Sequence, residues 1–378
     1  MLRKRCLLIL VILFVFSLML TGYAEDIIKI GAVGPLTGES SSAGLDELKG
    51  KQMAISDINA KGGVLGKDIQ LFFEDDASQP AQTASAAMKL IYQNGVVAII
   101  GAHNSACTLA VMEIIDKNKI PMVTPGSSSP KVTAIGNKWI TRAFPSDAIQ
   151  AKALVNYTLD TIGAKRIGII YINDDFGVGG YNAVKKSLEE RGENLAGAEL
   201  FMGEDKDMSS PLTKLKANNL DALFIWCQFL PGSLIMRQAR EMGWDIPFYT
   251  STGCVHPTIF ELAGDAFEGT IQTVPFIPNV PDPEIQEWVK RYEDKFGQEP
   301  SQNSARAYDA TMILLNAIEK AGSTEPEALR DAIRHTKDFQ GIQGKITIDP
   351  DTGEYIGEVM IVKAEKGDWT FINKVSTE

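Results

Sequence analysis

Residues 96–108 read VVAIIGAHNSACT and place a strand, a turn and the start of a helix in one short stretch. The unbroken apolar run at residues 96–100 is typical of a strand that is buried on both faces, as strands of parallel sheets are. Gly101 ends the run, and residues 105–119 have helical periodicity. A strand that leads straight into a helix is half of a βαβ unit, so this stretch predicts an α/β fold.

The same alternation continues in both directions along the chain. Strand-like runs are expected at residues 27–33, 69–74, 121–124, 166–172, 222–226 and 247–250, and helices at 45–59, 80–92, 148–162, 181–191, 212–218 and 234–242. The pattern restarts after residues 144–146. We therefore predict an α/β protein with two doubly wound parallel-sheet lobes joined by a multi-strand hinge.

The C-terminal part has a different pattern. Three helices are expected at residues 283–296, 305–321 and 325–335, followed by strands at 345–348, 356–362 and 369–374. These strands are too few for a third sheet, so we expect them to supplement the two lobes. The predicted lobes are residues 25–146 plus 276–352, and residues 147–275 plus 353–378.

Residues 1–24 have the features of a secretory signal peptide. Arg3, Lys4 and Arg5 precede a short apolar run, and Gly22 and Ala24 fit a small-residue cleavage site. We expect cleavage after Ala24 and export to the periplasm, with no cysteine near the cut to carry a lipid. An uncleaved membrane anchor is the alternative, but the apolar run is short for crossing a bilayer.

Charge and motifs exclude several classes of function. The net charge of −11 becomes −14 when the three basic residues of the signal peptide are removed, which argues against nucleic acid as a partner. Cys107, Cys227 and Cys254 then remain, an odd number with no metal-type spacing, and the three histidines are scattered. No GxSxG, HExxH or GK[ST] motif occurs, so we expect no metal, no cofactor and no enzyme.

The turn at residues 101–105 is a candidate anion site. Ser105 stands where a helix N-cap belongs, beside Asn104, and the free N–H groups of a helix start favour a negative charge. The alternative is that Ser105 only caps its own helix.

A second turn, TPGSSSP at residues 124–130, follows the next strand along the chain. Gly126 permits close approach to the backbone, and the hydroxyls of Ser127 and Ser128 can donate hydrogen bonds. An ordinary serine-rich turn is the alternative. Because both turns leave the carboxyl ends of neighbouring strands, we expect them to converge on one carboxylate.

In the second predicted lobe, three residues follow strand ends. Phe176 and Phe229 are candidate lids over the crevice or core aromatics, and Thr252 is a possible donor. Ligands of open α/β sheets bind at this edge, in the crevice between lobes.

The chain resembles the periplasmic leucine/isoleucine/valine-binding proteins, the type I solute-binding family of branched-chain amino acid importers. The resemblance covers essentially the whole mature chain and rests on several motifs in the family's order. They are IGAVGPLTG at 30–38, NAKGGVLG at 59–66, TPGSSSP at 124–130, DDFG at 174–177, RQAR at 237–240 and AGDAFEG at 263–269.

The resemblance implies roles for the site residues. The α-carboxylate of the ligand would be held by the Ser105 hydroxyl, the Gly126 backbone and Ser128, with Phe176 as the lid and Phe229 nearby. It also implies closure about a hinge, an ABC permease as partner, and a monomer. A sensor that signals to a receptor would use the same fold and closure.

The chain departs from the family pattern at three positions. Thr252 stands where amino-acid-binding members have a carboxylate for the ligand ammonium, and Ala43 stands where a tyrosine is frequent. Asn104 occupies a position of the family's frequent disulfide. Either Asp174, Asp175 or Glu39 replaces the missing acid, or the ligand lacks an amine, as aromatic acids, oxo acids, dicarboxylates and small amides do.

Overall fold

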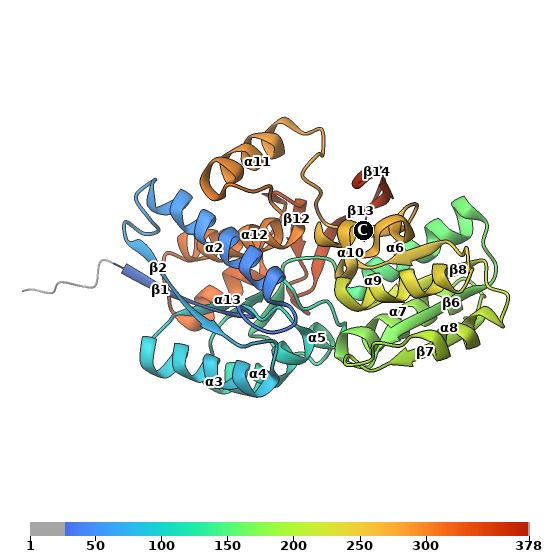
Figure 1. Cartoon of the computed structure of the whole chain (residues 1–378). Coiled ribbons are helices and arrows are strands. Elements are labelled where there is room, and N and C mark those ends of the chain that lie inside the picture. The colour runs from blue at the N-terminus through green and yellow to red at the C-terminus, as the bar shows by residue number, and fades with distance from the viewer. Residues whose placement is uncertain (1–26, 377–378) are drawn as a thin grey trace, which may run out of the picture.

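A computed structural model describes residues 27–376, which form two lobes side by side (Figure 1). The expected signal peptide, its cleavage site and Cys6 lie outside the described residues. No helix in the range 27–376 has the length and apolar character needed to cross a membrane.

The first lobe is built on a parallel sheet with the strand order β2-β1-β3-β4-β5. Its strands are β1 (Ile27–Gly34), β2 (Asp68–Asp75), β3 (Ala98–Ile100), β4 (Met122–Thr124) and β5 (Ile140–Arg142). Successive side chains of a strand point to opposite faces, so Ile100 packs on one side of the sheet and Ile99 on the other. Both faces are therefore buried, as the apolar run at 96–100 predicts.

Helices cover both faces of this sheet. They are α2 (Ser41–Asn59), α3 (Pro80–Lys89), α4 (Ser105–Asn118), α5 (Lys131–Ala134), α12 (Gln302–Ala321) and α13 (Pro326–Arg334). Helix α11 (Pro283–Phe296) packs outside them, against α2 and α12. Apolar residues of α12 pack with Ile30 and Ile100, whereas Val111 and Ile115 of α4 pack with Ile99 on the opposite side. Helix α12 also lies along α2.

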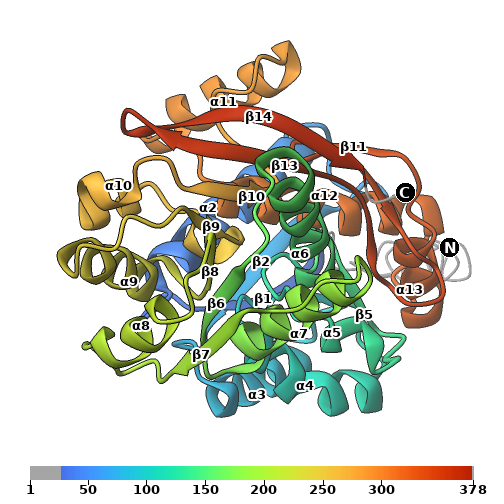
Figure 2. The same ribbon diagram turned by 90° about the vertical axis from the view of Figure 1, so that its right-hand side faces the viewer.

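A mixed sheet with the strand order β11-β12-β13-β10-β9-β8-β6-β7 forms the second lobe and extends into the first, where β11 and β12 pack in the first-lobe core. Its strands are β6 (Ile167–Ile172), β7 (Gly197–Phe201), β8 (Ala222–Trp226), β9 (Phe248–Thr250), β10 (Ile271–Val274), β11 (Phe339–Gly341), β12 (Gly344–Ile348), β13 (Tyr355–Glu365) and β14 (Asp368–Ser376). Strands β6 to β10 are parallel, whereas β13 is antiparallel to β10 and carries β14 along its edge (Figure 2). The helices of this lobe are α6 (Asp147–Asn156), α7 (Asp175–Glu189), α8 (Ser209–Lys216), α9 (Phe229–Glu241) and α10 (Thr258–Ala263).

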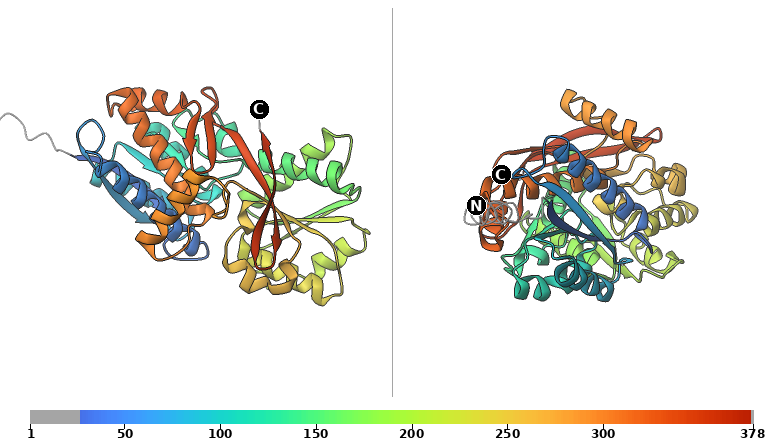
Figure 3. Two further views of the ribbon diagram at one scale, coloured as in Figure 1. Left: turned by 90° about the horizontal axis from the view of Figure 1, so that it is seen from above. Right: turned by 90° about the vertical axis from the view of Figure 1, so that its left-hand side faces the viewer.

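The chain passes between the lobes at three places in the described range. It leaves the first lobe between β5 and α6, returns between β10 and α11, and crosses again between β12 and β13 (Figure 3). The C-terminal elements thus supplement both lobes and form no third sheet, as expected from their small number of strands.

Some element boundaries differ from the sequence predictions. Helix α7 begins at Asp175 and not at residue 181, because Asp174 accepts a hydrogen bond from Gly177 N and caps it. Its glycines hide this start from a periodicity analysis but are required by packing, since a Cβ on Gly180 would lie 2.0 Å from Trp226 Nε1. Helix α9 likewise begins at Phe229 and not at residue 234.

Candidate ligand-binding cavity

A cavity lies between the lobes, and together with the solvent at its mouth it contains about 440 Å³ of space that protein atoms do not fill. Its walls come from the turns after β3 and β4, the turns after β6, β8 and β9, and the first turn of α12. The lining residues are Ala43, His103, Asn104, Ser105, Gly126, Ser128, Phe176, Gln228, Phe229, Thr252, Gly253, Val255, His256, Gln302, Asn303 and Arg306.

The two serine-bearing turns meet at one edge of the first-lobe sheet, because β3 and β4 are parallel neighbours. The Ser105 hydroxyl accepts a hydrogen bond from Ser129 N at 3.1 Å, which links the turns and leaves its own proton free to donate. The N-cap prediction for Ser105 is wrong by one position. The backbone at Asn104 is still extended, so Asn104 is the N-cap and Ser105 the first helical residue.

Gly126 lies where the second turn approaches the first most closely. A Cβ at this position would lie 2.6 Å from the carbonyl oxygen of His103 and 2.7 Å from its α-carbon. Only a glycine therefore lets the turns pack together. Gly126 lines the cavity, and its N–H makes a long hydrogen bond of 3.3 Å to Thr124 Oγ1. The adjacent Ser128 also lines the cavity.

Ser127, a predicted ligand-binding residue, does not line the cavity. Its hydroxyl lies 2.7 Å from Thr108 Oγ1 and also donates to the carbonyl oxygen of Ala102. Ser127 N donates to Thr124 Oγ1. Ser127 therefore holds the two turns in place without lining the cavity.

The second lobe contributes the aromatic side of the cavity. Phe176, at the start of α7, packs against Gly253, and Phe229 stacks on the ring of His256 with centroids 4.3 Å apart. Thr252 is held from both sides: its N–H donates to Gln150 Oε1, and its carbonyl accepts from Gln302 Nε2 at 2.7 Å. All three predicted residues of this lobe therefore lie at the cavity, and contact with a ligand remains a prediction for each of them and for those of the first lobe.

Helix α12 supplies three lining residues that the sequence reasoning missed, Gln302, Asn303 and Arg306. They lie far along the chain from the serine turns, so only the tertiary fold brings them to the site. The sequence contained one sign that Arg306 has a special role, because this charged residue stands between two alanines on a largely apolar helix.

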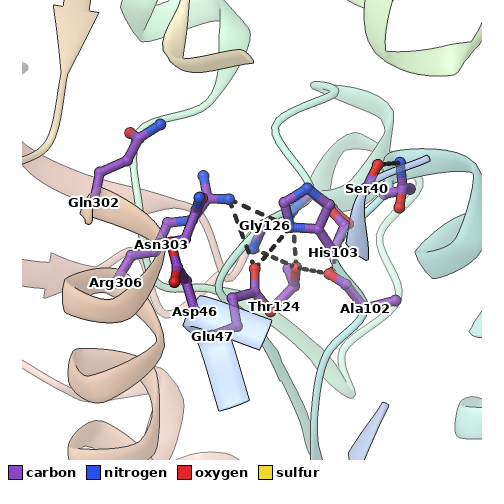
Figure 4. Close-up of polar contacts among 12 residues, drawn as sticks. Ser40, Asp46, Glu47, Ala102, His103, Thr124, Gly126, Gln302, Asn303 and Arg306 are labelled. Atoms are coloured by element: carbon purple, nitrogen blue, oxygen red, sulfur yellow. Dashed lines mark hydrogen bonds and ion pairs between the residues drawn. The ribbon is translucent and has the colours of Figure 1, made fainter. Parts of the chain in front are cut away.

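A buried charge cluster surrounds Arg306 (Figure 4). Glu47 of α2 lies 2.8 Å from His103 Nδ1, 3.0 Å from Lys51 Nζ and 3.6 Å from an Arg306 nitrogen. Burial by itself would raise the pKa of Glu47, but Lys51, His103 and Arg306 together lower it well below its ordinary value. Glu47 is therefore ionised and fully engaged within the cluster.

The acids suggested as substitutes for the missing family carboxylate are elsewhere. Asp174 caps α7, Asp175 pairs with Lys131 at 2.8 Å, and Glu39 lines a separate hollow beside Leu230 and Arg237. None of the three is among the residues that line the inter-lobe cavity.

Asp147 lies behind Ser128 at the first crossing between lobes. Its carboxylate accepts from Trp226 Nε1 at 3.1 Å. Burial raises its pKa to about 7, against the opposing influence of the Ser128 hydroxyl and the Arg142 guanidinium. This acid therefore holds its proton to a higher pH than an ordinary aspartic acid does.

The cysteines and histidines form no metal centre within residues 27–376. Cys107, Cys227 and Cys254 are free and buried. His335 is on the surface, as expected, whereas His103 and His256 line the cavity. Burial lowers the pKa of His256, so its ring is neutral at pH values where an ordinary histidine is partly charged.

Comparison with known proteins gives a consistent result. The profile of a family described as periplasmic binding protein matches residues 27–368. The leucine-, isoleucine-, valine-, threonine- and alanine-binding protein of Pseudomonas aeruginosa is 30% identical over 327 residues, which are 86% of this chain and 87% of that protein. The leucine binding protein LivK of Thermotoga maritima has a TM-score of 0.85 at 33% identity, over 93% of this chain and 99% of that one. LivJ of Streptococcus pneumoniae, a branched-chain amino acid transporter substrate binding protein in complex with isoleucine, has a TM-score of 0.85 at 26% identity, over 93% of this chain and 99% of that one.

Proposed function

Because the chain belongs to the periplasmic binding protein family, we propose that it captures a small carboxylate-bearing solute outside the cytoplasm and delivers it to an ABC importer. The names of its relatives support the transport role, since LivJ is the substrate binding protein of a transporter. We further propose export by the signal peptide at residues 1–24, a monomeric state, and a binding rather than a catalytic role.

The observation that carries this proposal is that the two lobes line the cavity with different kinds of groups. The first lobe offers uncharged donors, the Ser105 hydroxyl, the Gly126 backbone and Ser128, at the tips of adjacent strands. The second lobe offers the rings of Phe176 and Phe229. A carboxylate docks on the donors, and closure of the aromatic side removes the rest of the solute from water.

Closure requires two rigid bodies that move about the three crossings. We propose that these bodies are the two predicted lobes, residues 25–146 plus 276–352 and residues 147–275 plus 353–378. Contacts between the lobes support a closed arrangement. Lys131 of the first lobe pairs with Asp175 of the second at 2.8 Å, and Gln302 Nε2 donates to the carbonyls of Thr252 and Val255. A ligand that binds the closed form more tightly shifts the population toward it, and the permease would recognise that form.

Calorimetric titration of the mature chain with a panel of amino acids, hydroxy acids, dicarboxylates and aromatic acids tests the proposal. We expect one member of the panel to bind with one molecule per chain and to raise the melting temperature with concentration. Saturable binding of a cationic or uncharged solute, with no binding of any carboxylate, would contradict it.

A further inference from the structure

The charge balance of the cavity restricts the ligand further. Among the lining residues in the described part of the chain none is Asp or Glu, whereas Arg306 is a permanent cation. Behind the wall, Glu47 is paired with Lys51 and Arg306, and Asp46 and Asp76 also lie near this cluster. The lining itself therefore presents one cation and no carboxylate, within a protein that is acidic overall.

Two acids near the cavity, Glu47 and Asp46, already have partners, whereas Asp147 lies behind Ser128 with one carboxylate oxygen bonded to Trp226. Glu47 is held by Lys51, His103 and Arg306. Asp46 accepts hydrogen bonds from the Ser301 hydroxyl at 2.6 Å and from Gln298 Nε2. An ammonium group in the cavity would lose its hydration, find no carboxylate among the lining residues, and lie near the guanidinium of Arg306.

Unused hydrogen-bonding groups point to the same kind of ligand. Arg306 Nε is buried and has no hydrogen-bond partner among residues 27–376, and the contacts of this guanidinium with Glu47 and His103 are made through one terminal nitrogen. Gln302 Nε2 donates to two carbonyls, which fixes the orientation of its amide, and Gln302 Oε1 is left buried without a partner in the same part of the chain. A bound anion would satisfy the cation, and a hydrogen-bond donor on the ligand, such as a hydroxyl, would satisfy the amide oxygen.

We propose that the ligand is a small carboxylate with a neutral hydroxyl or similar donor in place of an ammonium group, and that Arg306 selects for this net negative charge. The inference rests on the proposed function and narrows its ligand class. The cavity then favours a hydroxy acid over the amino acid of the same carbon skeleton.

Matched pairs test this preference directly. The wild-type protein is titrated at neutral pH with lactate and alanine, leucic acid and leucine, phenyllactate and phenylalanine, mandelate and phenylglycine, and malate and aspartate. In each pair that binds, we expect the hydroxy acid to bind about tenfold or more tightly than the amino acid. An amino acid that binds as tightly as its partner would overturn the inference but leave the proposed function standing, whereas no binding by either set would contradict both.

Substitution of Arg306 tests its role separately. Arg306→Gln should weaken binding of the best hydroxy acid about ten- to a hundredfold, the range for a charge-assisted hydrogen bond. It should also reduce the ratio of the affinity for this hydroxy acid to the affinity for the matching amino acid. Arg191→Gln removes an exposed guanidinium of the second lobe and should leave both affinities unchanged. If folded Arg306→Gln keeps the wild-type ratio of hydroxy-acid to amino-acid affinity, Arg306 does not cause the preference. If this variant does not fold, the ratio measured for the wild-type protein still decides the ligand class.

Discussion

Ser105 combines a structural and a functional contact in one hydroxyl. Its oxygen accepts from Ser129 N, so the proton can be given to a ligand without breaking the link between the turns. Asp147 and Arg306 likewise make buried structural contacts and contribute to the charge around the cavity. At the scale of single residues, the cavity depends on side chains that are nearly fully buried in the closed protein.

Ser105→Ala should weaken carboxylate binding by about 1–3 kcal/mol, because a buried donor to a charged group is lost. Calorimetry against the best ligand measures this change. Ser85→Ala, which removes an exposed hydroxyl bonded only to its own helix, is the matched control. Equal affinity for all three proteins would place the carboxylate elsewhere.

Asp147 should make stability depend on pH between about 4 and 7. Its folded pKa of about 7 lies above the ordinary value of 3.8, so in this window the folded chain holds a proton that the unfolded chain releases. Stability from this group is therefore full below pH 4 and is lost as pH rises through 7. Asp309, whose pKa is raised to about 6 by burial, acts in the same direction.

Denaturant unfolding of Asp147→Asn from pH 4 to pH 8 checks this expectation. The variant retains an acceptor for Trp226 Nε1 and should gain stability relative to wild type as pH rises, by as much as about 4 kcal/mol. Asp294→Asn, on an exposed helix surface, should follow the wild-type curve. Parallel curves for wild type and Asp147→Asn would show that Asp147 is ionised in the folded protein throughout.

At the scale of elements, the site is made by strand-to-helix turns packed against one another. Sequence periodicity was sufficient to predict β3, β4 and α4, and hence that their turns converge, because long apolar runs and parallel neighbours follow from local patterns. It was insufficient for α7, where Gly177, Gly179 and Gly180 lower helix propensity. Tertiary packing nevertheless favours them, because a Cβ at these positions would meet Ile172, Ser129 and Trp226 respectively. Helix α12 was predicted, but its polar first turn carried no local sign of facing a distant lobe.

Gly126→Ala tests how closely the two turns must pack. The added carbon would meet backbone atoms of His103, which cannot move aside as a side-chain end can, so we expect a loss of about 1–3 kcal/mol in stability and weaker binding. Gly203→Ala is the control, because its Cβ would make only an ordinary contact at 3.6 Å with Ile172. Thermal unfolding that is equal for both variants would contradict the close approach.

At the scale of the whole molecule, the lobes share few direct bonds across the cavity, and Gln302 makes two of them. If the lobes separate in the free protein, these bonds exist only after closure and stabilise the bound state alone. The wide separation of their partners in sequence, residues 252–255 and 302, is why no local pattern revealed them.

Gln302→Ala should therefore increase the ligand dissociation rate and weaken affinity by about 1–3 kcal/mol, with little change in the stability of the ligand-free protein. Gln286→Ala is a matched control, since Gln286 Nε2 also donates to two carbonyls, those of Pro278 and Val280, away from the cavity. That control should lower stability and leave the dissociation rate unchanged. The reverse pattern would mean that the lobes do not open.

The most direct measurement of the central claim is a crystal structure of the mature protein with its tightest-binding carboxylate. The account predicts the carboxylate within hydrogen-bonding distance of Ser105 Oγ, Gly126 N and Ser128, with Phe176 and Phe229 closed over the remainder of the ligand. A ligand bound outside the inter-lobe cavity, or a Ser105 hydroxyl directed away from it, would contradict the account.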